Sequence, residues 1–368
     1  MAFDAGISRA PRLASLDVLR GLTIVGMILV NSAAYLHYVS GYDVFPVLMH
    51  SRWSGFTLAD AVFPAFIVMT GVSIPLATPA TGQALDGPGL RRLLVRSARL
   101  ILLGLLVSNI YWLATPESVA FRPMGVLQRI ALAFLAAAVL YRTTGPRVRL
   151  ALAAGLLLIY WPLCQLPYPG GVADLATPGS SLVAWLDRAV LGVHAYVKGP
   201  AGYDPEGLLG TLPAIAQALI GVAAGEWLMA RRGARGLALA GLGLLVAGLA
   251  WAVVFPVIKD LWTSSYVLVS CGATLLVLAG LHQSLDVKAW KLPGTAFLTD
   301  FGVNAIFAYV LHELASIMLT AHMLKIPYDA AAPLIGTKTA ALIPVAVFIG
   351  LLWAVLGYMH KRRWIVKV

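Results

Sequence analysis

Residues able to carry acid–base chemistry stand at the edges of long apolar segments, or inside them. His50 lies just before one such segment, and His312-Glu313 interrupt another. A histidine accepts protons near neutral pH because its ordinary pKa is about 6.5. Taken alone, His50 is also compatible with an ordinary solvated loop histidine. The His312-Glu313 pair is compatible with a proton relay, a substrate ligand or a satisfied structural bond.

Two arginines also fall within apolar segments, where a charged group costs at least about 2.5–3.5 kcal/mol. Arg20 follows Asp17 by one helical turn, so either the two form an interfacial ion pair or Arg20 belongs to an anion site for a phosphorylated cofactor. Gln128-Arg129 lie about one turn inside another segment. An arginine at that depth is expected to turn inward, toward a polar cleft.

The remaining polar candidates each have a structural alternative. Asn31 caps a helix or bonds to a neighbour, and Asp60 suits the first turn of a helix electrostatically. Asp204-Pro205-Glu206 fits a helix start, with Asp204 as the N-cap. Asn304 precedes His312 by eight residues, which separates them by about 80° around a helix.

The elements that position these residues must be membrane helices. Of the 368 residues 60% are hydrophobic and 12% are charged, with a mean hydropathy of +0.84. So few charges cannot cover a water-facing surface, which excludes a soluble enzyme, a disordered chain and a coiled coil. We predict an all-α polytopic bundle of about ten transmembrane helices, forming one domain over residues 1–368. The expected spans are 16–36, 57–78, 97–115, 124–142, 148–165, 208–230, 236–257, 263–283, 297–322 and 338–359.

The net charge of +11 is distributed as in membrane proteins, and this argues against nucleic-acid binding. Eighteen of the 27 Lys and Arg residues fall in alternate connecting segments and at the C-terminus. These segments are 9–12, 91–99, 142–149, 231–235, 288–291 and 361–367. The asymmetry places both termini in the cytoplasm and predicts an even number of spans. The first apolar run is too long for a signal-peptide core, so we expect a retained first span.

The longest connection, roughly 166–207, is expected to be a periplasmic loop. Within it, apolar residues recur at helical spacing after Ser180-Ser181, which predicts a short helix on the membrane surface. The small residues Gly221, Ala224 and Gly225 in one span, and Gly241, Gly243 and Gly248 in another, permit close helix contacts and make a homodimer plausible. Cys164 and Cys271 indicate neither a disulfide framework nor a metal site.

Five polar motifs along residues 12–315 resemble the heparan-α-glucosaminide N-acetyltransferase family. They are Leu16-Asp-Val-Leu-Arg-Gly21 with Val30-Asn31; His50-Ser-Arg-Trp-Ser-Gly-Phe-Thr-Leu-Ala-Asp60 with Val62-Phe-Pro64; Gly125-Val-Leu-Gln-Arg129; Tyr203-Asp-Pro-Glu-Gly-Leu-Leu-Gly-Thr211; and Lys259-Asp-Leu-Trp-Thr-Ser-Ser-Tyr266, with Asn304 and His312-Glu313 following in the family's order. Animal members are lysosomal and carry an additional lumenal N-terminal domain. This chain resembles the shorter bacterial members, for which the inner membrane is the expected location.

The resemblance implies transfer of an acetyl group from cytoplasmic acetyl-CoA to an amino sugar of the glucosamine type across the membrane. His50 matches the family's proposed catalytic histidine, and Asn31 an asparagine beside it. Cofactor contacts are expected from Arg20, Gln128, Arg129, Trp262, Ser264 and Ser265, and substrate contacts from Asp60, Glu206, Asn304, His312 and Glu313, with no metal.

Acetyl transfer from a thioester to an amine needs a base for the departing proton and a donor for the developing oxyanion, roles that suit His50 and Asn31. Attack in one ternary complex and an acetyl-histidine intermediate both remain open. An amino-sugar transporter is the alternative from another class, because many spans with buried charges also suit translocation. A non-catalytic scaffold is a third possibility, and it predicts no coenzyme binding.

Overall fold

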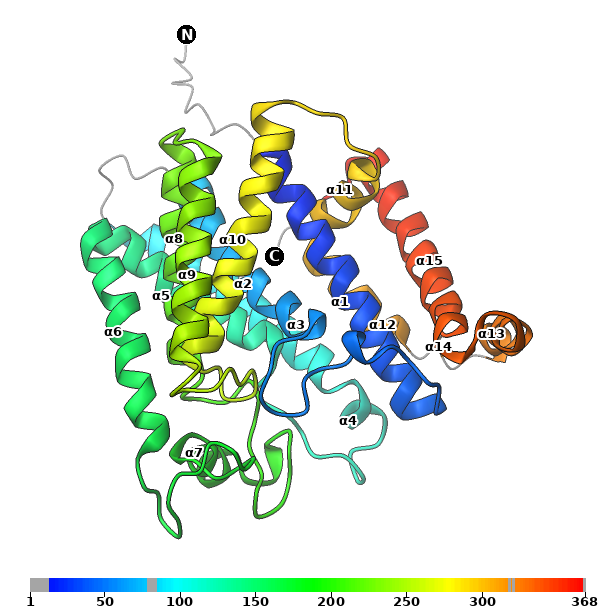
Figure 1. The fold of residues 1–368 in the computed structure, drawn as a ribbon, viewed down its shortest axis with the longest axis horizontal. Helices are drawn as coiled ribbons and strands as arrows, with labels where there is room; N and C mark the ends of the chain where they lie inside the picture. The colour runs from blue at the N-terminus through cyan, green and yellow to red at the C-terminus, as the bar shows by residue number, and fades with distance from the viewer. Residues whose placement is uncertain (1–12, 78–84, 317–318, 320–321, 367–368) are drawn as a thin grey trace.

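The fold is a bundle of helices that confirms the predicted polytopic membrane class. The computed structural model describes residues 13–77, 85–316, 319 and 322–366, and within these the only regular elements are helices. Among the described residues, eight helices are long and apolar enough to cross a membrane. Figure 1 shows most of them running between the two ends of the molecule.

Eight of the ten expected spans coincide with these helices. They are α1 (Ala14–Ser40), α2 (Leu58–Ala77), α5 (Val126–Thr143), α6 (Pro146–Gln165), α8 (Thr211–Met229), α9 (Ala234–Trp251), α10 (Ser264–Leu281, continued by the π-helical turn His282–Val287) and α14–α15 (Thr337–Ala340 and Leu342–Lys361).

The other two expected spans take a different form. Helix α3 (Gly87–Ser108) begins at Gly87 rather than at residue 97, so its first turns carry several arginines, and the short helix α4 (Ile110–Ala114) follows it. The span expected at 297–322 is divided at Asn304 into α11 (Thr295–Val303) and α12 (Ala305–Ala315). The sequence did not predict α13 (His322–Ile335). Residues 317–318 and 320–321 of the expected span lie outside the described residues.

Glycines allow the closest helix pairs to form, as expected from the small-residue pattern. A Cβ atom on Gly221 of α8 would lie 2.2 Å from the Val68 carbonyl oxygen of α2, and one on Gly248 of α9 would lie 2.8 Å from the Val269 nitrogen of α10. Gly243, by contrast, faces open space. The small residues thus serve contacts within one chain, and a homodimer stays a prediction.

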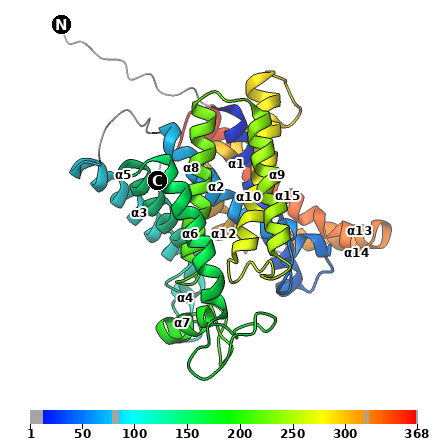
Figure 2. The ribbon, with the colours of Figure 1, turned by 60° about the vertical axis from the view of Figure 1, so that its left-hand side comes forward.

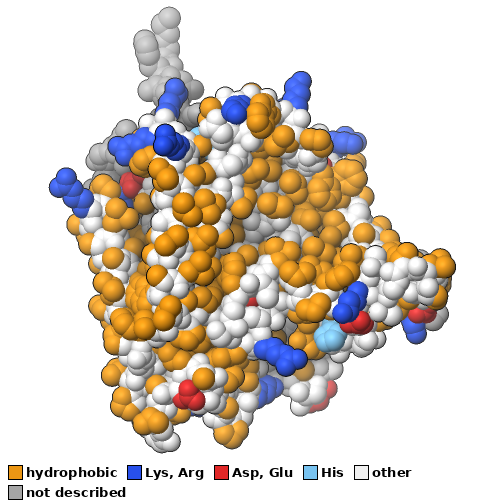
Figure 3. All heavy atoms as spheres, viewed as in Figure 1, with side chains coloured by type: hydrophobic (Ala, Val, Ile, Leu, Met, Phe, Trp, Pro, Cys, Tyr) orange, Lys and Arg blue, Asp and Glu red, His pale blue; other side chains and the backbone are white. Residues whose placement is uncertain are grey.

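Lysines and arginines gather at one end of the bundle, here called the basic end. Helices α1, α3, α6 and α9 begin there, and Figure 3 shows the cationic side chains above an apolar band. Arg9, Arg12 and Lys367 of the basic segments lie outside the described residues. The opposite end, here called the loop end, carries the long connection, and Figures 1 and 2 place α4 and α7 (Leu182–Leu191) there.

The predicted surface helix of the long connection is α7. Ser181 is its N-cap, because its side chain accepts a hydrogen bond from the Ala184 backbone N–H at 3.2 Å. The connection is attached to the segment before α2, since the Trp53 indole N–H donates to the Leu175 carbonyl at 2.8 Å. These contacts fix the loops around the residues that the sequence singled out.

Candidate active site

A cavity of about 450 Å³ at the loop end brings together four of the predicted site residues, Asn31, His50, His312 and Glu313. They come from α1, from the segment before α2, and from α12. Its volume lies in the range of small-molecule sites, about 300–1,000 Å³. Four tyrosines also line it, namely Tyr35, Tyr38, Tyr111 and Tyr196.

His50 is held between a buried anion and a cation. Its Nδ1 atom lies 2.8 Å from Asp60 Oδ1, and the Asp60 side chain is fully buried while that of His50 is 44% exposed. On the other side, Lys259 Nζ lies 3.3 Å from His50 Nε2. The carboxylate attracts positive charge on the ring and the ammonium repels it. Asp60 also fixes which edge of the imidazole faces the cavity.

Asp60 is itself fixed by hydrogen bonds from the start of α2. Its Oδ2 atom accepts from the backbone N–H of Thr57 at 3.0 Å and of Ser51 at 3.2 Å, and from the Thr57 hydroxyl at 3.0 Å. The predicted position in the first turn of a helix is correct. Asp60 was expected to contact the substrate. In the structure it instead lies behind His50 and does not line the cavity.

Asn31 and the His312-Glu313 pair form the far wall of the cavity. Asn31 Nδ2 donates to Glu313 Oε1 at 3.3 Å. The imidazole of His312 is 2% exposed, and neither of its ring nitrogens has a hydrogen-bond partner among the described residues. Its Nδ1 lies 3.6 Å from Glu313 Oε1, too far for a hydrogen bond. A buried polar group without a partner is unfavourable, so this ring is available to a ligand in the cavity.

A charged cluster of Arg122, Asp204 and Glu206 lies beside the cavity. Arg122 Nη2 contacts Asp204 Oδ1 at 2.7 Å and Glu206 Oε2 at 2.5 Å, and its guanidinium stacks over the Tyr196 ring at 4.4 Å. Burial raises the pKa of Glu206, but the nearby cations Arg122, Arg129 and Lys259 outweigh it and hold that pKa below its ordinary value. The cluster therefore contributes a buried, ionised carboxylate.

The interpretation of Asp204-Pro205-Glu206 as a helix start is wrong. Helix α8 begins at Thr211, with Gly210 in the N-cap position and no side-chain cap. Both carboxylates instead pair with Arg122, which stands 82 and 84 residues earlier in the chain. Asp204 Oδ1 still accepts a hydrogen bond from the Glu206 N–H at 2.9 Å, as in a turn, but no helix follows at this point. The strong charge-assisted pairing with Arg122 is the interaction that the local sequence did not reveal.

Arg129 lies deeper, as its position inside an apolar segment predicted. Its side chain is 1% exposed, Nη2 donates to the Gly207 carbonyl at 2.9 Å, and the guanidinium stands 4.7 Å from the Trp262 ring centroid. Nε and Nη1 have no hydrogen-bond partner among the described residues. The Trp262 indole donates to Gln217 Oε1 at 3.0 Å. Arg129 and Trp262, both expected at the cofactor, are thus in direct contact.

None of the residues expected at the cofactor lines the cavity that contains His50. Arg20 bonds to Asp17 at 3.3 Å and to the Ser73 hydroxyl, so the ion pair proposed from the sequence is present. The hydroxyls of Ser264 and Ser265 donate to the carbonyls of Leu157 and Pro256. Gln128 packs against Gly104 of α3.

Asn304 also lies outside the cavity. Its amide donates to the Trp364 carbonyl at 3.0 Å and accepts from the Val366 N–H at 2.9 Å. These bonds tie the break between α11 and α12 to the segment after α15, so this amide has a structural task.

Sequence reasoning missed several residues that the structure places at the site. Lys259 stood inside a quoted motif but was given no role, although its Nζ lies 3.3 Å from His50 Nε2. The four cavity tyrosines gave no signal, because single aromatics near span ends are common in membrane proteins. Arg122 lies in a connection between spans, and only its partners reveal its importance.

Comparison with known proteins now identifies the family. The model described as heparan-alpha-glucosaminide N-acetyltransferase, catalytic, matches residues 12–253, which is more than half of the chain. This chain belongs to that family. The heparan-alpha-glucosaminide N-acetyltransferase family also provides curated relatives: the human protein of that name is 29% identical over 83% of this chain and 53% of its own length. The mouse protein is 30% identical over 83% of this chain and 54% of its own. The chain thus spans about half the length of these relatives.

Proposed function

We propose that the protein is a transmembrane acetyltransferase that moves an acetyl group from cytoplasmic acetyl-CoA to the amino group of a glucosamine-type sugar. The observation that carries this proposal is His50, braced by buried Asp60 at a cavity that also contains Asn31 and Glu313. Family membership supports the reaction class. By the positive-inside rule, the basic end faces the cytoplasm and the loop end the periplasm of a bacterial inner membrane.

The reaction breaks the acetyl C–S bond and forms a C–N bond. As the neutral amine attacks the thioester carbonyl, His50 takes the proton that the amine loses, and the protonated ring then gives this proton to the departing thiolate, which leaves as the free thiol. Asp60 positions the ring and stabilises its positive charge. An Asn side chain has two N–H donors, and Asn31 uses one on Glu313. The second serves the developing oxyanion, a contribution on the order of 3–4 kcal/mol in comparable sites.

The cavity walls suit an amino sugar. Glu313 can accept a hydrogen bond from the sugar, and the tyrosine faces pack against an apolar sugar face. His312 is available to a sugar hydroxyl. Asn31, His312 and Glu313 therefore serve the acceptor and the reacting carbonyl, while Asp60 is a positioning residue.

Purified protein tests the proposal directly. With acetyl-CoA and glucosamine, the wild type should form N-acetylglucosamine, and His50→Ala should lose most of this turnover. His194→Ala is the matched control, because His194 is another loop-end histidine and bonds to the Phe121 carbonyl outside the cavity. A wild type that binds or moves the sugar but forms no product would favour the transporter alternative. A burst of acetyl-enzyme without acceptor would identify the acetyl-histidine route.

A further inference from the structure

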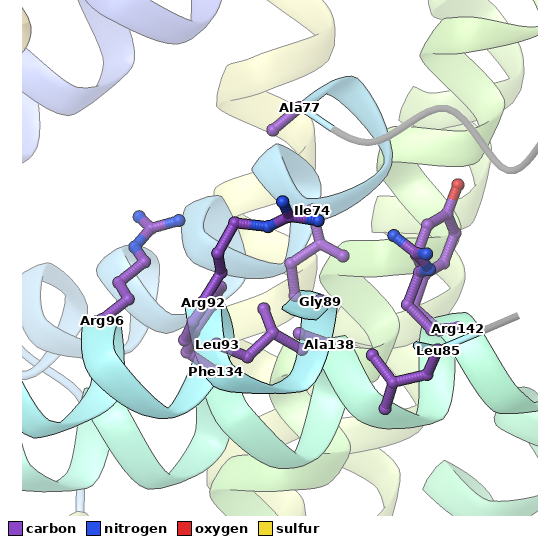
Figure 4. A pocket seen from close by; sticks show the side chains of 11 residues that line it. Ile74, Ala77, Leu85, Gly89, Arg92, Leu93, Arg96, Phe134, Ala138 and Arg142 are labelled. Atoms are coloured by element: carbon purple, nitrogen blue, oxygen red, sulfur yellow. The ribbon is translucent and has the colours of Figure 1, made fainter. Parts of the chain in front are cut away.

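A second group of charged residues lies at the basic end, far from His50, and has no role so far. A cavity of about 240 Å³ is enclosed between the first turns of α3, the last turns of α5 and the end of α2. Figure 4 shows Arg92 and Arg96 rising from α3, with Arg142 on the other side of Ile74 and Ala138. The cavity thus combines an apolar floor with a cationic rim.

The positive charge continues onto the outer side of α3. An adjoining cavity of about 730 Å³ shares Arg92 and Arg96 and adds Arg91 and Arg99. Among the described residues that line either cavity there is no Asp or Glu. The nearby Asp86 carboxylate accepts from the Gly89 N–H at 2.8 Å, capping α3. Like charges spaced three and four residues apart on a helix repel one another, so this cluster favours binding of a multiply charged anion.

The guanidinium groups are suited to phosphate. Arginine binds phosphate oxygens through two parallel N–H bonds, and neighbouring arginines can hold several phosphates of one ligand. The Arg96 guanidinium is supported by the Phe134 ring, 4.4 Å away. The apolar floor beside the rim accommodates a ring or chain attached to the phosphates.

Helix α3 connects this region to the candidate active site. Arg96 lies in its first half, and Val107, eleven residues later, lines the cavity that contains His50. At the helical rise this separation is about 16 Å. Arg20, the sequence-based candidate for a phosphate site, is instead engaged with Asp17 and Ser73.

We propose that Arg92 and Arg96 bind the phosphates at the nucleotide end of the donor, on the helix whose other end lines the His50 cavity. The identity of the ligand as acetyl-CoA rests on the proposed function. The chemistry itself, recognition of a phosphate-bearing group over an apolar floor, rests only on the cavity.

Binding of coenzyme A and of 3′-dephospho-coenzyme A to the purified protein, measured without turnover, tests this assignment. The variant Arg92→Gln/Arg96→Gln should bind coenzyme A at least about tenfold more weakly, the scale expected for losing hydrogen bonds between charged groups. Any preference for coenzyme A over its dephospho form should shrink in the double variant. Arg147→Gln, an exposed arginine at the same end and outside both cavities, should bind like the wild type.

A phosphate-free donor separates loss of the site from loss of the fold. S-acetyl-N-acetylcysteamine should acetylate glucosamine equally well with the double variant and the wild type. Unchanged coenzyme A affinity in a folded double variant overturns the assignment, and so does an effect confined to binding of phosphatidylglycerol nanodiscs, which would make the site a lipid site. Arginine-dependent coenzyme A binding by a protein that acetylates no sugar would uphold this site while refuting the proposed reaction.

Discussion

Replacing Asp60 by asparagine tests the contact between Asp60 and His50 with very little change in side-chain shape. The carboxylate of Asp60 contacts His50 Nδ1 at 2.8 Å and accepts three hydrogen bonds on its other oxygen. An amide has only one oxygen. Keeping that oxygen on the Thr57 side turns an N–H toward His50, and this favours the imidazole tautomer with its proton on the wrong nitrogen.

The expected loss is large because His50 then presents an N–H to the reacting amine. Positioned proton transfer contributes about 10²–10⁴ in rate, and the comparable change in a Ser-His-Asp triad lowers kcat about 10⁴. We therefore expect kcat to fall about 10²–10⁴, equivalent to about 3–5 kcal/mol. The KM for acetyl-CoA should hardly change, because Asp60 does not line the cavity. Asp43→Asn, an exposed change near the same end, is the control.

A double-variant cycle separates positioning from a merely structural effect. Since Asp60 acts through His50, adding Asp60→Asn to His50→Ala should cost almost nothing further. If Asp60→Asn lowers kcat by the same factor in both backgrounds, the two residues act independently and the positioning role is refuted.

Three further outcomes follow from particular contacts. Burial raises the pKa of Asp187 to about 6 from an ordinary 3.8, so the folded protein retains a proton that the unfolded chain releases, and stability falls as the pH rises through this window. Asp187→Asn should thus gain up to about 3 kcal/mol relative to the wild type between pH 4 and 7, measured by thermal unfolding in detergent; a constant difference would contradict this. Gly221→Ala should lower the unfolding temperature because its Cβ meets the Val68 carbonyl, whereas Gly243→Ala, facing open space, should not; equal effects would contradict the packing. Arg129→Ala should weaken acetyl-CoA binding or reduce turnover beyond any loss of folding, and unchanged kinetics in a folded variant would defeat that role.

The sequence by itself determined the class of this protein and the positions of most helices. Hydropathy is a local property, so long apolar runs predict spans whatever their partners. Placing a polar side chain inside such a run costs free energy, so these residues are rare and stand out in the sequence. Arg129 and His312 could be recognised in this way. The motifs around His50 made it the candidate catalytic histidine, and they could be recognised because each is contiguous in the chain.

Only the tertiary structure decided what those residues contact. Lys259 contacts His50 although 209 residues separate them in the sequence, and Asn31 contacts Glu313 at a separation of 282 residues. No local pattern encodes such distances, because the partners are selected by helix packing and by the need to pair buried charge. Because buried charges must be paired, Asp60 lies against His50, and Glu206 pairs with Arg122 and does not begin a helix.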